Sequence, residues 1–455
     1  MRTTTTRVIG VVFAAVASFV GPTHAANLLF ENVTLIDGTG TALLPGASVL
    51  VRGDRIDTVS AAPLKHDAGV EVIDGTGKFL MPGLIDSHIH LGANAIRDPK
   101  EPGAHRTGVV ALHGYLYSGV TTVYDSGNNP DYIFPIREEE RTGKIVAPRV
   151  FASGSTITVP GGYGDGPTSI KITDWKESGP QLETYLKQRK PDLQKVLLDR
   201  HGIFSHLDPV ISVENLRKVT RLANENGVRT TVHASSEEDY NDALAGGIDE
   251  FAHIVRYAAS DGLIRLLATR RIPISTTLVV FNYIQRIADD ASFLDDPLFL
   301  AAIDADILTR QKGPERQRYI SSGMSEEFKS SVAKYMPTNA KRLFDAGGIL
   351  ALGTDRGWGP TVHMELALLH SLGIPLLDLT KLATLNGAIY LGKDKDLGSI
   401  QRGKLADLLL LNADPTQDVK NFQSIAAVYK GGSKIDFSVL DIQKNRGSGE
   451  PPRPR

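Results

Sequence analysis

The stretch MPGLIDSHIH, residues 81–90, closes an apolar run with two histidines one residue apart. Successive side chains of a strand point to opposite faces, so Asp86, His88 and His90 would share one face. Two imidazoles at this spacing can reach one ion, and neutral imidazole is a common ligand of zinc-like metals. A hydrogen-bonded pair of histidines at a strand end is the alternative. The rest of the chain must decide between the two interpretations.

The bulk composition narrows the choice of partners and ligands. The 455 residues suffice for one large domain and a smaller one. A formal net charge of −2 gives no electrostatic reason to expect nucleic acid as a partner. The chain has no cysteine, which excludes disulfides and thiolate metal sites. Any metal must therefore be held by nitrogen and oxygen ligands.

The two ends of the chain have sequences that are atypical of a folded domain. In residues 1–25, Arg2 and Arg7 precede an apolar core that is short for a membrane span, and Ala25 stands at a cleavage site. We expect a signal peptide, with an uncleaved anchor as the alternative. The protein would then be exported, to the periplasm or the medium, with no stable membrane insertion after cleavage. Residues 441–455 are rich in Pro, Gly and Arg and are expected to be disordered.

Short β-rich runs separated by turn sequences such as DGTG and RGD occupy residues 26–80. Short β-rich runs separated by turn sequences occur again only at residues 396–440. We infer that these two segments pair into one composite β-sandwich domain. Residues 81–395 would then be a long insertion that folds as a domain of its own.

Within 81–395, strand-like runs alternate with helix-like ones. The helix expected at 213–226 shows the pattern, with Ser212 as N-cap and Gly227 as stop. Alternation of this kind predicts an α/β fold, a (β/α)8 TIM-like barrel, with a doubly wound open sheet as the alternative. The eight strand runs are 83–90, 121–127, 149–158, 194–199, 229–236, 250–255, 272–280 and 349–357.

Titratable residues gather near the ends of these predicted strands, where a barrel places its active site. A single histidine there is more often an ordinary core or surface residue. Four histidines together with a carboxylate would need several independent coincidences. We therefore predict a metal centre. The four histidines are His88, His90, His233 and His253, and the carboxylate is Asp355; Lys195, near the start of the fourth run, is a further titratable residue of the set.

The chain resembles the metal-dependent amidohydrolase superfamily in the motifs PGLIDSHIH, GVTTVYDSG, TVHA, GIDEFAHI, LALGTD and LGSIQRGKLADLLLL. The resemblance implies a distorted (β/α)8 barrel that holds one or two divalent metals and is flanked by a β-sandwich. GVTTVYDSG and the loop GGYGDG at 161–166 are most similar to the prolidase and ochratoxinase-like branch.

The resemblance also implies a ligand set. His88 and His90 would bind the more buried ion with Asp355, and His233 and His253 would bind the second. Lys195 would be carboxylated and bridge two ions, expected to be Zn²⁺. An ammonium beside two dications would be repelled, whereas the carboxylated form is anionic. The alternative for Lys195 is an ordinary lysine that reaches solvent.

This set implies a mechanism and a substrate class. Two metals lower the pKa of a bridging water, to about 7 on zinc. Asp355 would take up the proton and return it to the leaving amine, while Tyr163, where relatives commonly have histidine, would stabilise the oxyanion. We expect a binuclear hydrolase of amide or peptide C–N bonds that acts on dipeptides or N-acyl amino acids. The alternatives are a mononuclear deaminase or cyclic amide or amidine hydrolase, and a non-catalytic binding barrel.

The segment 281–347 is unusually long for one connection between a strand and a helix. It carries Arg310, Arg316 and Arg318. A basic run of this kind is usually a solvated helix face. The functional alternative is a lid whose arginines bind a substrate carboxylate. We also expect the protein to be a homo-oligomer.

Overall fold

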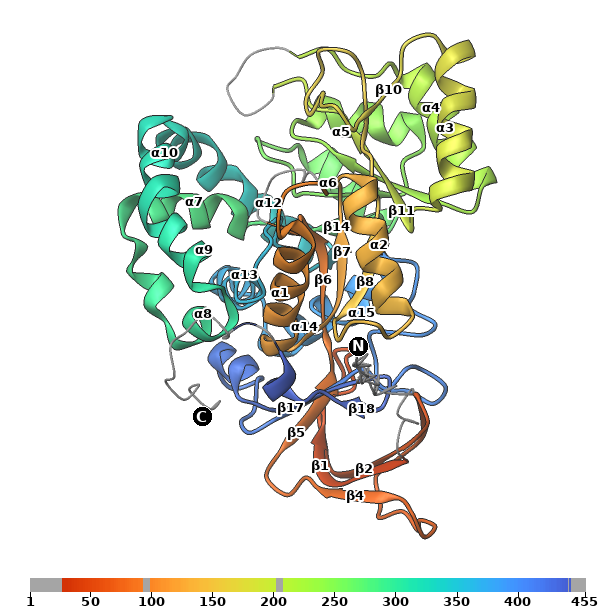
Figure 1. Cartoon of the computed structure of the whole chain (residues 1–455), viewed down its shortest axis with the longest axis vertical. Helices are drawn as coiled ribbons and strands as arrows, with labels where there is room; N and C mark the ends of the chain where they lie inside the picture. The colour runs from red at the N-terminus through yellow and green to blue at the C-terminus, as the bar shows by residue number, and fades with distance from the viewer. Residues whose placement is uncertain (1–26, 93–98, 202–207, 441, 443–455) are drawn as a thin grey trace, which may run out of the picture.

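The computed structural model describes residues 27–92, 99–201, 208–440 and 442 of the chain (Figure 1). The predicted signal peptide and, apart from Ile442, the predicted tail lie outside these residues. Within the described part of the chain, no helix combines the length and the apolar character needed to cross a membrane.

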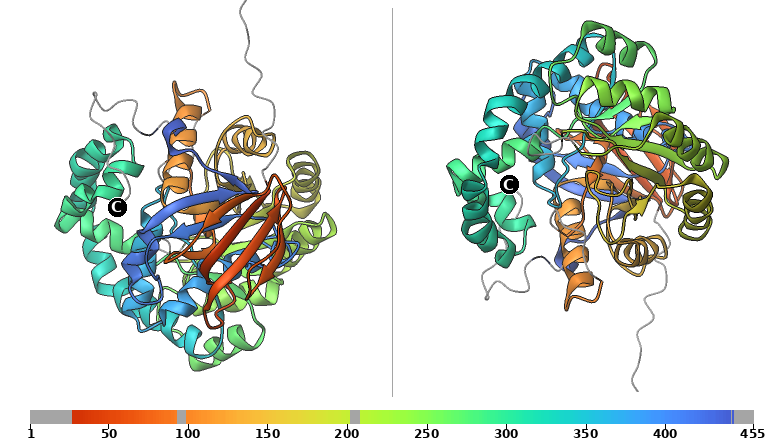
Figure 2. Two further views of the ribbon diagram at one scale, coloured as in Figure 1. Left: turned by 90° about the horizontal axis from the view of Figure 1, so that it is seen from below. Right: turned by 90° about the horizontal axis from the view of Figure 1, so that it is seen from above.

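Strands from both ends of the chain form one sheet. β5 is antiparallel to β16 on one side and parallel to β1 on the other, with Leu80 opposite Leu410. The order is β18-β17-β16-β5-β1-β2-β3, and β4 pairs with β1. Figure 2 shows the red N-terminal and blue C-terminal strands side by side. The strands are β1 (Leu28–Leu35), β2 (Leu44–Arg52), β3 (Arg55–Ser60), β4 (Glu71–Asp74), β5 (Phe79–Pro82), β16 (Leu408–Leu411), β17 (Ile425–Lys430) and β18 (Ser433–Lys434).

The inferred pairing of the two chain ends is therefore present, as a single eight-stranded sheet. Its strands enclose an apolar cluster of their own that includes Phe30, Val49 and Leu408. That this sheet forms the predicted sandwich stays a prediction.

Between these ends, each of the eight predicted strand runs contains a strand, and all these strands pair in parallel. They fall into two sheets, β6-β7-β8 and β10-β9-β11-β12-β13-β14-β15. Their bounds are β6 (Leu84–Ile89), β7 (Val120–Asp125), β8 (Arg149–Ala152), β9 (Ile157–Thr158), β10 (Ile170–Lys171), β11 (Leu193–Leu197), β12 (Arg229–His233), β13 (Glu250–Phe251), β14 (Pro273–Ser275) and β15 (Ile349–Ala351).

The predicted α/β class is confirmed, but among the described residues the strands do not form one continuous closed sheet. Where the two sheets meet, single hydrogen bonds from side chains and from the backbone link the strands. At β8 and β11, Lys195 N donates to Ser153 Oγ at 2.9 Å. At β6 and β15, Thr354 N donates to Asp86 Oδ1 at 3.1 Å. Backbone bonds from Asp192 N to Ala152 O and from Ser87 N to Leu352 O also link the outer strands, both at 2.9 Å.

Several predicted strands are shorter than expected. The run 250–255 is a strand only at Glu250–Phe251, and 149–158 divides into β8 and β9. The run 272–280 ends as a strand at Ser275, and α7 (Val279–Asp289) begins four residues later. The Glu365 carboxylate accepts hydrogen bonds from Leu278 N at 3.1 Å and Val279 N at 2.6 Å. This distant acceptor satisfies the first amides of α7, which the local sequence does not cap.

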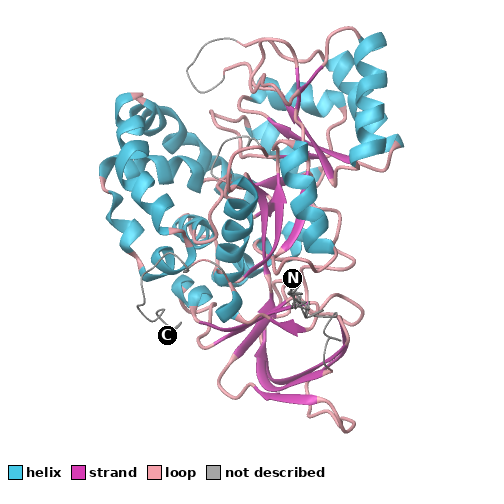
Figure 3. Ribbon diagram, viewed as in Figure 1, coloured by secondary structure: helices cyan, strands magenta, loops and turns pink. Residues whose placement is uncertain are grey.

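Helices pack around the parallel strands (Figure 3). The helix predicted at 213–226 is confirmed as α4, and the Ser212 hydroxyl accepts from Asn215 N at 3.2 Å. The helices outside the long insertion are α1 (Ala104–Tyr117), α2 (Pro130–Arg141), α3 (Trp175–Arg189), α4 (Val213–Glu225), α5 (Glu237–Gly246), α6 (Asp261–Thr269), α13 (Thr361–Ser371), α14 (Leu376–Leu382) and α15 (Leu385–Tyr390).

The long segment between β14 and β15 is largely helical and stands on one side of the molecule, on the left in Figure 1. We call residues 279–345 the helical insertion. Its helices are α7, α8 (Pro297–Ala302), α9 (Ala305–Arg310), α10 (Arg316–Ser321), α11 (Met324–Glu327) and α12 (Ala333–Asp345).

Candidate metal centre

His88 and His90 lie at the end of β6, and each ring is held by a backbone carbonyl. His88 Nδ1 is 3.0 Å from Ala252 O, and His90 Nδ1 is 2.8 Å from Gly127 O. A carbonyl can only accept, so Nδ1 of each ring carries a proton, and either ring, when neutral, keeps the Nε2 lone pair for another partner. Although burial lowers it, the pKa of His90 lies above its usual value because its Nε2 faces the Asp355 carboxylate. Burial, followed by the Lys195 charge, holds the pKa of His88 well below its usual value. His88 is therefore a neutral ring whose Nε2 can bind a cation.

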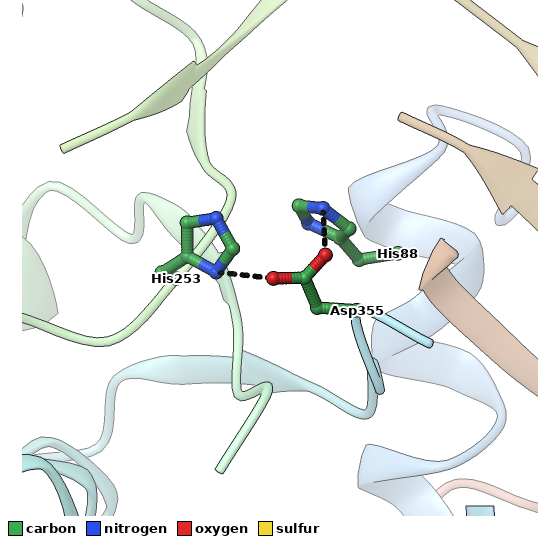
Figure 4. Close-up of side chains that lie close together, drawn as sticks. All are labelled: His88, His253 and Asp355. Atoms are coloured by element: carbon green, nitrogen blue, oxygen red, sulfur yellow. Dashed lines mark ion pairs between the residues drawn. The ribbon is translucent and has the colours of Figure 1, made fainter. Parts of the chain in front are cut away.

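Asp355 follows β15 and lies between His88 and His253 (Figure 4). Its Oδ1 is 3.2 Å from His90 Nε2 and 3.5 Å from His88 Nε2, and its Oδ2 is 4.0 Å from His253 Nδ1. Although burial raises the pKa of this carboxyl, the histidines, His88 first, hold it well below its usual value. Its φ of +51° is uncommon for a residue with a side chain and marks local strain at the site.

The ligand atoms of His88, His253 and Asp355 all lie within 4.8 Å of one another. Two imidazole nitrogens and one carboxylate oxygen are a typical donor set for zinc and similar divalent ions. Burial holds the pKa of His253 well below its usual value, and its Nδ1 lies 2.9 Å from Thr277 Oγ1. The three side chains therefore fit a bound divalent ion.

Lys195 points into the same centre. Its Nζ donates to Ser126 Oγ at 3.0 Å and lies 3.4 Å from His88 Nε2. The side chain is 2% exposed, so it does not reach solvent. Burial lowers the pKa of Lys195 to about 7, so much of the amine is neutral near that pH.

His233 lies on the other side of His253, with 4.6 Å between the ring centroids. Its Nε2 is 2.9 Å from Asp199 Oδ2, which also accepts from Ser235 Oγ at 2.7 Å. Although burial raises the pKa of Asp199, His233 and Arg256 lower it below its usual value. A carboxylate behind an imidazole fixes the ring orientation and leaves the other ring nitrogen, Nδ1, for a metal.

Tyr163 is also brought to the site, because its ring stacks on His233 with centroids 4.5 Å apart and planes 15° apart. The Thr158 hydroxyl donates to Tyr163 O at 3.0 Å and holds the loop in place. Burial raises the pKa of Tyr163 to about 12, so the phenol keeps its proton. Tyr163 can therefore donate a hydrogen bond to a substrate oxygen.

Four of these side chains, Tyr163, His233, His253 and Asp355, lie on one side of a pocket of about 90 Å³, which we call the active-site pocket. The opposite wall is apolar and comes from the helical insertion. The polar residues of the pocket are Tyr163, His233, Ser235, His253, Arg256 and Asp355. The apolar residues from the insertion are Val280, Phe281, Ile284, Met324, Phe328 and Met336.

The structure does not bring the three predicted arginines to this pocket. Arg310 lines a different hollow beside Asp304 and Asp306. Arg316 Nη2 donates to Ala288 O at 3.4 Å, and the Arg318 guanidinium lies 5.7 Å from the Tyr319 ring centroid. The insertion does cover the site, but it does so with apolar side chains. The arginine that lines the pocket is Arg256.

Sequence reasoning missed Asp199 and Arg256, although both lie shortly after a strand, as the predicted ligands do. Asp199 comes two residues after β11, and Arg256 three residues after His253. The rule that identified the histidines would have found both. Asp86 has a structural role instead. Its carboxylate accepts a hydrogen bond from Thr354 Oγ1 at 2.7 Å, which links the end of β15 to β6.

Comparison with known proteins identifies the family of the chain. The amidohydrolase family model matches residues 79–435. The ochratoxinase of Aspergillus niger is 24% identical over 378 residues, which is 77% of this chain and 74% of that protein. The imidazolonepropionase of Geobacillus kaustophilus is 32% identical over 148 residues, which is 30% of this chain. The latter match spans only 35% of that relative's length.

Solved structures share the fold over nearly the whole chain. A protein from Bifidobacterium longum classed as a prolidase has a TM-score of 0.72 and 25% identity, and covers 91% of this chain and 95% of its own. A Xaa-Pro dipeptidase with methionine bound in its active site has a TM-score of 0.71 and 23% identity, with 90% and 100% covered. The amidohydrolase family model covers most of this chain, so the chain belongs to the amidohydrolase family, with prolidase-like and ochratoxinase relatives.

Proposed function

We propose that this amidohydrolase uses two divalent metals to cleave the C–N bond of a dipeptide or an N-acyl amino acid. The observation that supports two ions best is the buried Lys195, whose Nζ lies 3.4 Å from His88 Nε2. Burying a lysine beside histidines takes its charged group out of water, and this costs free energy that an ordinary surface lysine does not lose. As a carbamate, it would instead be the anionic bridge between two cations.

In this proposal His88, His90 and Asp355 hold one ion, His233 and His253 hold the other, and Lys195 joins them. The bound ions would polarise the substrate carbonyl and supply a hydroxide at neutral pH. Asp199 orients His233 through the 2.9 Å contact to its Nε2. Ser126 positions the Lys195 side chain through the 3.0 Å bond to its Nζ.

The chain's own residues would handle the protons. Asp355, ionised and next to three imidazoles, accepts one proton and returns it to the leaving nitrogen as the C–N bond breaks. Tyr163, protonated, donates to the carbonyl oxygen as negative charge develops there. The net reaction adds water across the amide and releases a carboxylic acid and an amine. The apolar wall of the insertion keeps other water away.

Arg256 is the residue we propose for binding the substrate carboxylate, in place of the three arginines of the insertion. It is 7% exposed and lines the active-site pocket. Its Nη2 lies 3.7 Å from Asp199 Oδ2, close enough for that carboxylate to hold the guanidinium in position. Guanidinium and carboxylate groups can pair through two parallel hydrogen bonds, which would orient the scissile amide.

A second candidate is a hydrolase of cyclic amides with a single metal. His88, His253 and Asp355 alone make a sufficient group for one ion. The partial match to an imidazolonepropionase favours this reaction class over others.

A screen of dipeptides, N-acyl amino acids and a cyclic imidazolone tests both candidates. Protein loaded with zinc and bicarbonate should bind two ions per chain and release amine from linear amides. Lys195→Ala should lower the metal content to about one ion and remove most activity. One ion per chain at saturation, together with opening of the cyclic substrate only, would instead establish the second candidate.

The role of Arg256 is tested by comparing each acid substrate with its C-terminal amide. The acid should have the higher kcat/KM in the unaltered protein, and Arg256→Gln should remove the difference mainly through KM. Arg318→Gln is the matched control, because that side chain lies outside the pocket. Equal kcat/KM for acid and amide in the unaltered protein would contradict the assignment.

A further inference from the structure

A second hollow lies directly behind the apolar wall of the active-site pocket. It is a groove of about 210 Å³ between α7, α12 and α13, which we call the insertion groove. Its walls include Leu278, Phe281, Val332, Met336, Leu368 and Leu372. Phe281 and Met336 also line the active-site pocket, so these two side chains alone are shared by both hollows.

The volumes show that the active-site pocket alone is too small for the proposed substrates. Pockets that enclose a small-molecule ligand usually measure roughly 300 Å³ or more. The active-site pocket has about 90 Å³, enough for the reacting group and little else. Joined to the 210 Å³ of the insertion groove, it would reach the usual lower bound.

Met336, one of the two shared side chains, can move without a change in the backbone. Methionine is unbranched and has three rotatable bonds, so Met336 can adopt other rotamers at low cost. The Phe281 ring contacts Phe328 edge to face at 4.5 Å and lies 5.5 Å from the Arg256 guanidinium. Glu365 fixes the start of α7 through two backbone amides. The start of α7 would therefore stay in place while Met336 turns.

The character of the insertion groove indicates which part of a substrate it can take. Among the described side chains, none of those that line it is charged, and its polar members are the neutral Asn282, Gln285 and Ser371. The charged Arg256 lines the active-site pocket instead. A substrate with one charged and one apolar end would place the carboxylate near Arg256 and the apolar end toward the groove.

We propose that the insertion groove binds the apolar acyl chain of N-acyl amino acid substrates, which enter it between Phe281 and Met336. This inference rests on the proposed hydrolysis of such amides. It narrows the substrate class to amino acids that carry a medium-length or long acyl group. Burial of one methylene is worth about 0.8 kcal/mol, which corresponds to about fourfold in kcat/KM per added methylene until the groove is full.

The test compares acetyl, butyryl and octanoyl derivatives of one amino acid, with kcat/KM measured for each. In the unaltered protein kcat/KM should rise more than tenfold from acetyl to octanoyl. Leu368→Trp, which fills the groove from α13, should abolish this rise and leave the acetyl substrate unchanged. Leu372→Trp, at the partly buried C-cap of the same helix, is a second block if the first variant is poorly folded. Leu300→Trp, in α8 and outside both hollows, is the matched control.

Calorimetry on the metal-loaded protein with N-octyl and N-ethyl amino acids, which have no amide bond to hydrolyse, supplies an independent measurement. The N-octyl compound should bind at least tenfold more tightly than the N-ethyl compound, and both groove variants should remove that difference. A rise in kcat/KM that persists in both variants, or no dependence on chain length at all, would overturn the assignment of the groove. If no derivative is hydrolysed but binding depends on chain length and is blocked by Leu368→Trp, the groove assignment stands and the proposed reaction fails.

Discussion

At the scale of single residues, Asp355 is the residue around which the other side chains of the site are arranged. Its carboxylate lies next to three histidines. Its backbone has a left-handed conformation, in which Asp355 N donates a hydrogen bond to His88 O at 2.7 Å. A strained residue persists only where its surroundings determine its position. Its carboxylate is thus presented to the pocket by the backbone of β6 as well as by its own strand.

Asp355→Asn should abolish hydrolysis while the fold is kept, because an amide cannot take up and return the proton. We expect kcat to fall by about 10²–10⁴-fold or more, in the range of general acid–base catalysis. Circular dichroism and thermal unfolding should match the unaltered protein. Asp345→Asn, at an exposed helix end, is the control and should retain full activity. A folded Asp355→Asn protein with most of its kcat would show that another group moves the proton.

Tyr163→Phe should lower kcat by about 10²–10³-fold with little change in KM, as expected when one donor to an oxyanion is removed. The stacking on His233 would survive, since it needs only the ring. Tyr335→Phe in α12 is a control outside the pocket. An effect on KM alone would assign Tyr163 to substrate binding.

The site residues found from the sequence alone were those whose spacing has a local meaning. His88 and His90 alternate on a strand, and His233 and Asp355 follow apolar runs, so each could be placed without knowledge of its neighbours. The arginines could not be placed, because a basic run has the same pattern on a lid and on a solvated helix. Arg316 in fact donates to backbone oxygens of its own insertion, which depends on how the helices pack.

At the scale of elements, α7 shows why strand boundaries could not be predicted. Val279 and Val280 are β-formers next to an apolar strand, and local preference favours continuation of the strand. Glu365 overrides this preference from 86 residues away by accepting the first amides of a helix. Each of the eight predicted runs contains a strand, because a buried parallel strand is an apolar run, whereas the two-residue strand β10 was not predicted. The ends of the strands were not predicted correctly, because tertiary contacts decide them.

His363 in α13 should make the fold sensitive to acid. Its Nε2 donates to Ser118 O at 2.9 Å, while its Nδ1 is buried and has no hydrogen-bond partner among the described residues. Burial lowers the pKa of His363 from 6.5 to about 4. Between these values the unfolded chain binds a proton that the folded chain does not. The free energy of unfolding therefore decreases as the pH falls from about 7 to 4, by about 3 kcal/mol from this residue.

Urea denaturation at several pH values measures this effect. His363→Gln should flatten the dependence of the unfolding free energy on pH between 7 and 4. His370→Gln, exposed on the same helix, should leave it as it is. Identical slopes for His363→Gln and the unaltered protein would contradict the role of His363.

At the scale of the whole molecule, two partly buried ion pairs link the sheet of the chain ends to β8 and α2. Arg149 of β8 donates to both oxygens of Asp407, at 2.6 and 3.0 Å. Lys430 of β17 donates to Glu140 of α2 at 2.5 Å. Neither contact is visible in the sequence, since more than 250 residues separate the partners.

Asp407→Ala should destabilise the protein by about 3 kcal/mol, because it leaves the largely buried Arg149 without its partner. Asp396→Ala is the matched control, since it breaks the exposed pair with Arg55 and should cost less than about 1 kcal/mol. Urea midpoints measure both losses. Equal losses in the two variants would mean that burial of the Arg149 pair adds nothing to its strength.

The pairing of β5 with β16 also determines when, during synthesis, the polypeptide can complete this sheet. More than 300 residues lie between these strands, and ribosomes add about 5–20 residues per second. For about 15–60 s the nascent chain must carry Phe79, Leu80 and Met81 on an open strand edge, which is a template for aggregation. A chain whose translation stops before residue 408 never closes that edge, so premature termination should yield insoluble product rather than a smaller folded protein.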